Sequence, residues 1–318
     1  MRPIFEGLSF GPEDLVCGAR IPFSQAMTMM DRAARLAGMP ELGLRVGLRN
    51  DHHCFGPVGA MMACAPTLGQ GLVQYVRLQG GMSQAASSYL LPMGNCVALC
   101  FGIYDSQAAG AEQIYALGMG TATNMVRSLS AGAVTPLEVH FSFKPPPNPQ
   151  LFSALLKTEV RFNQPQTCIV MASSALSTPN SAADAVHYDS LRHALSKALG
   201  LSDLSATARL KHVLRPALSM GETSLEAAAR HLQMSPRSLN RHLAAEGTSF
   251  AHERDRVRFV MASELLAMTE LSIGEISAAL SYANHSAFVR SFRRWSGVAP
   301  SRWRTEHAST HLPHEAEP

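Results

Sequence analysis

The chain has 318 residues, of which 46% are hydrophobic and 16% charged, and its formal net charge is +3. This composition predicts ordinary folded cores and excludes a fibrous or wholly disordered protein, and the length suits two domains better than one. No run reaches the roughly 20 apolar residues of a membrane span, so no membrane partner is expected.

The six cysteines all precede residue 169, and the first residues lack the long apolar core of a signal peptide. Both features favour a reducing, cytoplasmic setting in which the cysteines are packed thiols rather than disulfides. Cys96 and Cys100 would share one face of a strand without an evident histidine partner. We therefore predict no metal site there.

The first part of the chain mixes helical and strand patterns. Ser24 is expected to cap a helix that ends at Gly38, and a second helix follows Thr67. Alternating apolar residues predict strands, with 139–143 half-buried, and a helix is expected between two of them. The predicted strands are 97–104, 139–143, 159–162 and 167–171, the helix is 114–129, and the proline run 145–149 is predicted to be a stiff loop.

A further helix, capped by Asp189 and ended by Gly200, either packs on its own domain or pairs with a second chain. Residues 201–205 form the predicted linker. The stretch 206–305 is then an all-helical domain, in which Thr223 and Glu226 form a capping box. The tail 306–318 has the composition of a disordered segment.

One helical pattern is written twice in this stretch, at 225–246 and 273–296. Arg241 and Arg290, which follow the two turns, are 49 residues apart, so the unit is a duplicated helix-turn-helix. Apolar spacing predicts one helix over 249–268 between the copies. At 1.5 Å per residue this helix is roughly 30 Å long, close to the roughly 34 Å between successive major-groove faces on one side of B-DNA.

Charge supports the same interpretation. Residues 220–304 hold eleven arginines, no lysine and eight acidic residues, so the whole positive excess lies there. Arginine suits bidentate contacts to guanine and phosphate. Arg237 and Arg241, like Arg290 and Arg294, are four apart and share one helical face, with no acid among them.

The two patterns resemble the paired helix-turn-helix modules of the AraC/XylS transcription regulators. The resemblance lies in residues 234–243, in 246–250 and in 286–304, which closes with Pro300. It implies that side chains in the first turns of each second helix reach bases. The matching positions are Arg237, Asn240, Arg241, His285, Ser286 and Arg290.

One position departs from that family, because Ser281 stands where glycine is usual before an aromatic residue. Serine adopts a positive φ less readily than glycine, so the second turn is expected to be slightly strained or differently shaped. Residues 10–190, through 56–59, 65–69 and 159–163, resemble the arabinose-binding-like domain of one branch of the group. That likeness implies a mixed α/β sensor domain and hence an α+β chain, without implying arabinose as the ligand.

Catalytic signatures are missing from the sequence. Gly118 and Gly120 begin like a dinucleotide loop, but Thr123 replaces the third glycine, and no phosphate loop, nucleophile elbow or zinc-protease motif occurs. His52 and His53 stand beside Asp51, yet adjacent histidines point to different sides of most backbones, so a surface turn is favoured over a metal site. We expect no cofactor, no metal and no enzymatic activity.

Three hypotheses follow. In the preferred one, residues 1–200 bind a small-molecule effector and residues 206–305 bind double-stranded DNA. The protein is then a transcription activator that recruits RNA polymerase, as most members of the resembled family do. In the second, the first domain only dimerises or contacts partners. In the third, an enzyme carries a fused DNA-binding domain.

Overall fold

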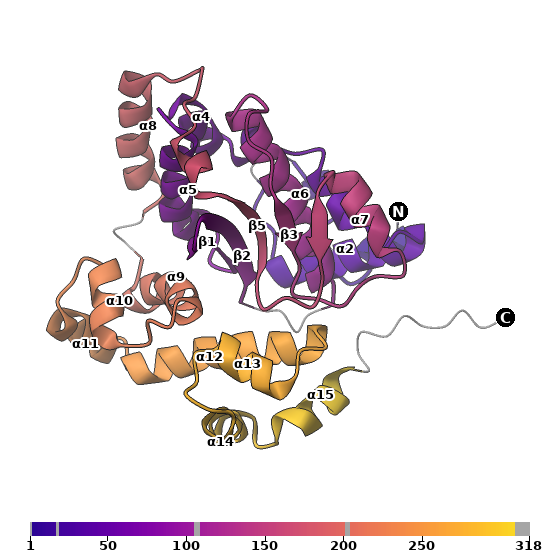
Figure 1. Cartoon of the computed structure of the whole chain (residues 1–318), viewed down its shortest axis with the longest axis vertical. Coiled ribbons are helices and arrows are strands. Elements are labelled where there is room, and N and C mark those ends of the chain that lie inside the picture. Colours follow the sequence, from indigo (N-terminus) through magenta and orange to yellow (C-terminus); the bar gives the residue numbers. More distant parts are fainter. Residues whose placement is uncertain (1, 17–18, 105–108, 201–203, 309–318) are drawn as a thin grey trace.

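The computed structural model describes residues 2–16, 19–104, 109–200 and 204–308. It is an α+β protein, in which a helical body lies below a sheet-containing body (Figure 1). The sheet has five strands in the order β1-β2-β5-β3-β4, antiparallel except for the β3–β4 pair. The strands are β1 Ala86–Met93, β2 Cys96–Ile103, β3 Glu138–His140, β4 Glu159–Arg161 and β5 Thr167–Ala172.

Helices cover one face of the sheet and its ends. The longest of them, α6, contributes buried residues to the same apolar core as the inner side chains of β2, β3 and β5. The helices of this body are α1 Arg2–Phe5, α2 Phe23–Ala37, α3 Leu42–Gly47, α4 Pro57–Cys64, α5 Leu68–Met82, α6 Ala111–Leu129, α7 Pro149–Leu156 and α8 Ala185–Ala198. Short 3-10 turns lie at η1 Pro12–Asp14, η2 His52–Phe55 and η3 Ser173–Ser177.

Several predicted elements are confirmed, and some of their details are wrong. Thr67 caps α5 and Gly38 ends α2 in a left-handed conformation, as expected. Ser24, however, does not cap α2 but lies inside it, because the helix begins at Phe23 with Pro22 as its cap. The cap of α8 is Asp184 rather than Asp189, since the Asp184 side chain accepts a hydrogen bond from the His187 amide.

The predicted strand at 139–143 is shorter and more buried than the pattern indicated. The pairing of β3 with β4 and β5 ends at His140, and the alternate residues His140 and Ser142 are buried as well. The reason is tertiary, because Ser142 bonds to Glu264 of the helical body. The proline run also ends sooner than expected, since Pro149 occupies the first turn of α7.

The lower body is a bundle of seven helices among the described residues: α9 Ala206–Ser219, α10 Leu225–His231, α11 Pro236–Ala245, α12 Phe250–Met268, α13 Ile273–Ala279, α14 His285–Ser296 and α15 Pro300–Ala308. The predicted spacer at 249–268 is confirmed as α12, with Ser249 as its cap. Thr223 and Glu226 do not form the expected box. Ser224 caps α10 instead.

The end of the chain differs in part from expectation. Residues 305–308 continue α15, so the predicted disordered tail begins too early, and its remaining residues, like 201–203 of the predicted linker, lie outside the described residues. Of the cysteines, the five that the structure describes are free thiols, as predicted, and Cys17 lies outside.

Candidate DNA-binding surface

The first module is α10, a four-residue turn and α11. Ser235 caps α11 by accepting a hydrogen bond from the Ser238 amide at 3.1 Å, and Pro236 occupies the first helical position. Leu239 and Leu243 are buried against the bundle. Their burial turns the opposite face of α11 toward solvent.

The second module repeats this construction with different side chains. Asn284 caps α14 by accepting from the Ala287 amide at 2.9 Å, and Phe288 and Phe292 take the buried positions. Both the caps and the buried pairs of the two modules are offset by 49 residues. The predicted repeat is therefore present in the backbone as well as in the sequence.

Both turns contain a left-handed residue that is not glycine. Gln233 has φ 54° and Ser281 has φ 57°. The serine that departs from the usual glycine does take a positive φ, as expected. Its hydroxyl also donates to the Leu218 carbonyl of α9 at 2.7 Å, which compensates for part of the unfavourable backbone conformation.

The helix α12 holds the two modules apart. Its 19 residues make it roughly 28 Å long. Its second half is buried on almost every side, because α9, α13 and α15 pack on it and Ala267 and Met268 enter the core of the sheet-containing body. The apolar spacing predicted the helix but not that polar positions such as Ser263 and Glu264 are buried as well, because their burial depends on packing against other elements.

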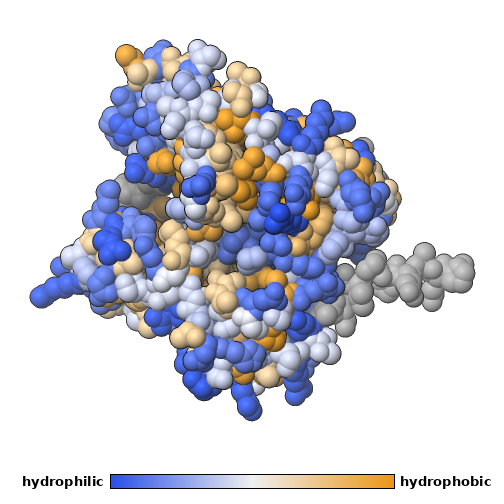
Figure 2. Space-filling view, viewed as in Figure 1, coloured by the Kyte–Doolittle hydropathy of each residue, from blue (hydrophilic) through white to orange (hydrophobic). Residues whose placement is uncertain are grey.

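All six residues predicted to reach bases are exposed: Arg237, Asn240, Arg241, His285, Ser286 and Arg290. Within the described part of the chain, none of these six side chains forms a hydrogen bond or ion pair with another protein group. Figure 2 shows hydrophilic residues standing out along the left and lower edges of the helical body, where α11 and α14 lie in Figure 1. These six side chains are thus free to meet a ligand.

The arginine excess serves structure as well as surface charge. Arg258 is buried with its guanidinium 4.6 Å from the centre of the Tyr282 ring, and burial lowers its pKa. Arg294 pairs with Asp255 of α12 at 2.8 Å. The expectation that no acid faces Arg290 and Arg294 is therefore wrong at Arg294, because the acid comes from the neighbouring helix.

A buried polar network joins the two bodies, and sequence reasoning missed it. Arg215 of α9 pairs with Glu264 of α12 at 2.7 Å, and both side chains are almost fully buried. Arg215 also donates to the Ile103 carbonyl of β2 at 2.9 Å, and Glu264 accepts from Tyr115 and Ser142. A clue was present, since Glu264 is the only charged residue in the stretch 259–269.

The network shapes its surroundings. A side chain at Gly102 of β2 would overlap Arg215, because a Cβ there would lie 2.0 Å from Nε. Burial and the Glu264 carboxylate together raise the pKa of Tyr115. Burial, the largest single cause, lowers the pKa of Arg215, but the Glu264 carboxylate and the Tyr115 and Tyr89 hydroxyls together outweigh it, so the pKa is raised.

The cysteines of the sheet have a neighbour that the sequence did not reveal. Cys100 faces Cys168 across β2 and β5, and Cys168 faces His140 on β3. Hydrogen bonding from Cys100 and His140 lowers the pKa of Cys168 to about 6. His140 thus accompanies Cys168 rather than Cys96 or Cys100, and Cys168 connects it to Cys100, because strand pairing brings together residues far apart in the chain.

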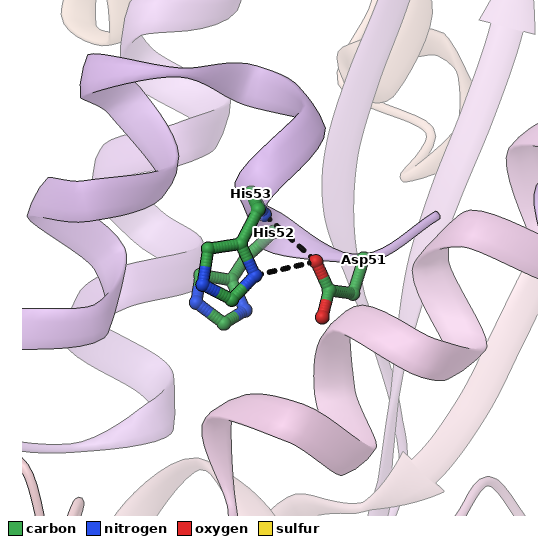
Figure 3. A group of neighbouring side chains, drawn as sticks. All are labelled: Asp51, His52 and His53. Carbon is green, nitrogen blue, oxygen red and sulfur yellow. Dashed lines mark hydrogen bonds and ion pairs between the residues drawn. The ribbon is translucent and has the colours of Figure 1, made fainter. Parts of the chain in front are cut away.

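The histidine pair also differs from expectation. His52 and His53 do not diverge, since their ring centres are 4.0 Å apart in the 3-10 turn η2, and His53 bonds to Asp51 at 2.8 Å (Figure 3). Candidate ligand atoms of these three residues lie within 4.8 Å of one another. The ring planes are 34° apart, and one nitrogen of His53 already bonds to Asp51, so we assign no metal centre to this group.

A small cavity of ≈ 190 Å³ lies inside the sheet-containing body. It is lined mainly by apolar side chains of β2 and α6, with Tyr75 and Ser88 among the polar groups.

None of the helices that the structure describes is long and apolar enough to cross a bilayer.

The two capped modules, set on a rigid spacer behind an α+β domain, define a DNA-binding transcription regulator. Residues 1–180 match the family model of the arabinose-binding domain of AraC transcription regulators, and residues 228–306 match a helix-turn-helix domain. The chain belongs to the AraC family.

Two transcription regulators and one solved structure resemble the chain over most of its length. The chain is 28% identical over 310 residues to the ornithine utilization regulator of Pseudomonas aeruginosa, which covers 95% of this chain and 90% of that protein. It is also 28% identical over 279 residues to the HTH-type transcriptional regulator VirS of Mycobacterium tuberculosis, covering 87% and 82%. The crystal structure of the regulator CdpR from Pseudomonas aeruginosa aligns with 90% of this chain and 99% of its own, with 18% identity and a TM-score of 0.45.

Proposed function

We propose that this regulator reads two successive major grooves on one side of DNA with α11 and α14. The observation that carries the proposal is that six polar side chains on these helices are exposed and unpaired within the described residues, beside a buried spacer roughly 28 Å long. Arg237, Asn240 and Arg241 would act in the first groove. His285, Ser286 and Arg290 would act in the second, with phosphate contacts supplying affinity and base contacts supplying sequence choice.

We further propose that the protein activates transcription in the cytoplasm by recruiting RNA polymerase, in response to a small-molecule effector. Support for the effector comes from the match of residues 1–180 to a ligand-binding type of domain and from the cavities of the structure. The relatives are named as regulators, which supports action by binding rather than by catalysis. A homodimer is compatible with the proposal and is not required for it.

Selection of bound duplexes from a random DNA library by the full chain tests this function. The expected result is an enriched motif with two conserved blocks whose centres are one helical turn apart. A library that yields no enriched sequence, or one block alone, contradicts the proposal. A reporter gene placed behind the enriched motif then measures activation directly, and unchanged or reduced expression contradicts the activator role.

A further inference from the structure

A large cavity lies between the two bodies. Its walls come from α5 and β1 above, and from α9, α10 and the turn between α10 and α11 below. The volume of ≈ 610 Å³ lies within the range of small-molecule sites. A molecule bound there would touch the sensor side and the DNA-binding side together.

The walls are mostly apolar. A ligand with a hydrocarbon body would remove this surface from water, which is favourable at about 25 cal/mol per Å². The apolar lining residues are Val73, Val76, Leu90, Leu204, Val213, Pro216, Met220 and Leu232.

Within the described part of the chain, the lining contains four basic side chains and no aspartate or glutamate. The basic residues are Arg77 on α5, Arg209 and His212 on α9, and His231 on α10. Glu222, which is not among the lining residues, pairs with His231 at 2.7 Å. The two arginines therefore give the described lining a net positive charge.

Arg209 also connects the cavity to the first module. Its guanidinium donates to the Leu232 carbonyl, 3.3 Å away, at the end of α10. Since a guanidinium has five donor hydrogens, others remain for a ligand. His212 packs against Gly80, and burial and Lys211 lower its pKa, so it offers a neutral ring to the cavity.

We propose that this cavity binds an organic carboxylate with an apolar body, held by Arg77 and Arg209 at its charged end. This inference rests on the proposed function, for which it names the effector class and site. Occupancy would fix the first recognition helix relative to the sensor body, because the ligand contacts α5 and β1 as well as the turn that contains Gln233.

Isothermal titration calorimetry of the full chain tests the proposal with four probes: decanoate, 2-naphthoate, decanol and inorganic phosphate. At least one carboxylate should bind, and which of the two does so tells whether the body is aliphatic or aromatic. The double variant Arg77→Ala/Arg209→Ala should weaken that carboxylate by at least about 10-fold and leave decanol unchanged. Val76→Trp should fill the cavity and weaken the carboxylate equally, whereas Arg35→Ala, on α2 away from the cavity, should change nothing.

Four results would overturn the proposal: binding of neither carboxylate, decanol binding as tightly as decanoate, phosphate binding as tightly as the carboxylates, or full affinity in Val76→Trp. Thermal melts establish that each variant folds, and Val76→Trp still tests the location if the double arginine variant does not fold. Selection of DNA by the same preparation separates the two proposals. A protein that enriches a motif but binds no carboxylate refutes only the cavity assignment, and one that binds a carboxylate but no DNA refutes the proposed function.

Discussion

The two helix-turn-helix modules share one backbone plan but differ in what holds them. The first is packed with small and aliphatic residues: Ala227, Ala228 and Ala229 of α10 are buried, with Leu239 and Leu243 of α11 beside them. The second is built on aromatic rings, which are Phe259, Phe288, Phe292, Trp295 and Trp303. A duplicated unit has thus kept its caps and turns while its two cores diverged.

The modules also differ in their neighbours. The turn of the first contributes to the cavity between the bodies, and its supporting helix α9 packs on β1. The turn of the second is anchored to α9 through Ser281, and its recognition helix packs on α12, α13 and α15. We infer that a bound effector would change the position of the first module, whereas the second module would keep its position in the helical body.

The largest expected effect separates the two cores. Phe292→Ala removes a fully buried ring from the aromatic cluster and should lower the free energy of unfolding by about 3 to 5 kcal/mol. Its matched control is Leu243→Ala, at the equivalent position of the first module, which should cost less because fewer atoms are removed. Urea unfolding of both variants measures this, and a larger loss for Leu243→Ala would contradict the comparison.

Next in size is the buried network that ties α9 and α12 to the sheet. Glu264→Gln leaves the Arg215 guanidinium without its carboxylate and should cost about 2 to 3 kcal/mol of stability. Tyr115→Phe removes only a hydroxyl and should cost about 1 kcal/mol. Equal, negligible losses in the two variants would show that the ion pair does not hold the bodies together.

The recognition faces are compared through the equivalent arginines. Arg241→Ala and Arg290→Ala should each weaken binding to the selected motif by about 1 to 3 kcal/mol, and each should relax preference in one block only. Band-shift titrations at fixed salt against motifs mutated in either block measure both effects. Loss of preference in the same block for both variants would refute the assignment of one groove to each module.

A smaller difference lies in the acid beside the second helix. Asp255→Asn should free Arg294 for DNA phosphate and steepen the dependence of affinity on salt by about one counterion. The Arg294 side chain is 65% exposed and the Asp255 side chain 24%, so solvent screens the pair and the cost in stability should be less than about 1 kcal/mol. An unchanged salt slope would indicate that Arg294 points away from bound DNA.

The smallest effects concern the turns. Gln233→Gly relieves an unfavourable φ in the first module and should stabilise the chain by about 0.5 to 1 kcal/mol. Ser281→Gly gains the same relief but loses the hydrogen bond to Leu218, so its net effect should be near zero. Thermal unfolding compares the two, and a larger gain for Ser281→Gly would mean that the serine hydroxyl contributes nothing.

The sequence was most informative where structure is set by local chemistry. The break at 233–236, the apolar spacing of 249–268 and the repeat offset of 49 residues depend on neighbours along the chain, so the modules and the spacer were predicted within a residue or two. The exposure of the six candidate base-reading residues follows from the same periodicity. Their contacts with DNA stay a prediction.

The features that sequence reasoning missed depend on contacts between distant segments. β1, α3, α4 and α7 carry weak local patterns and form because neighbouring elements give them a surface to pack on: β2 for β1, α6 for α3, α5 and α8 for α4, and β4 for α7. Glu264 meets Tyr115 across 149 residues of chain, and Cys168 meets His140 only through strand pairing. Periodicity along the chain contains no information about such pairs.

Methylation protection of guanine N7 on the selected duplex tests the central claim most directly, because N7 lies in the major groove. Two protected patches are expected on one side of the duplex, about 10 base pairs apart. Arg241→Ala should abolish the protection of one patch, and Arg290→Ala should abolish the protection of the other. A single patch, or two patches on opposite sides of the duplex, would contradict the account.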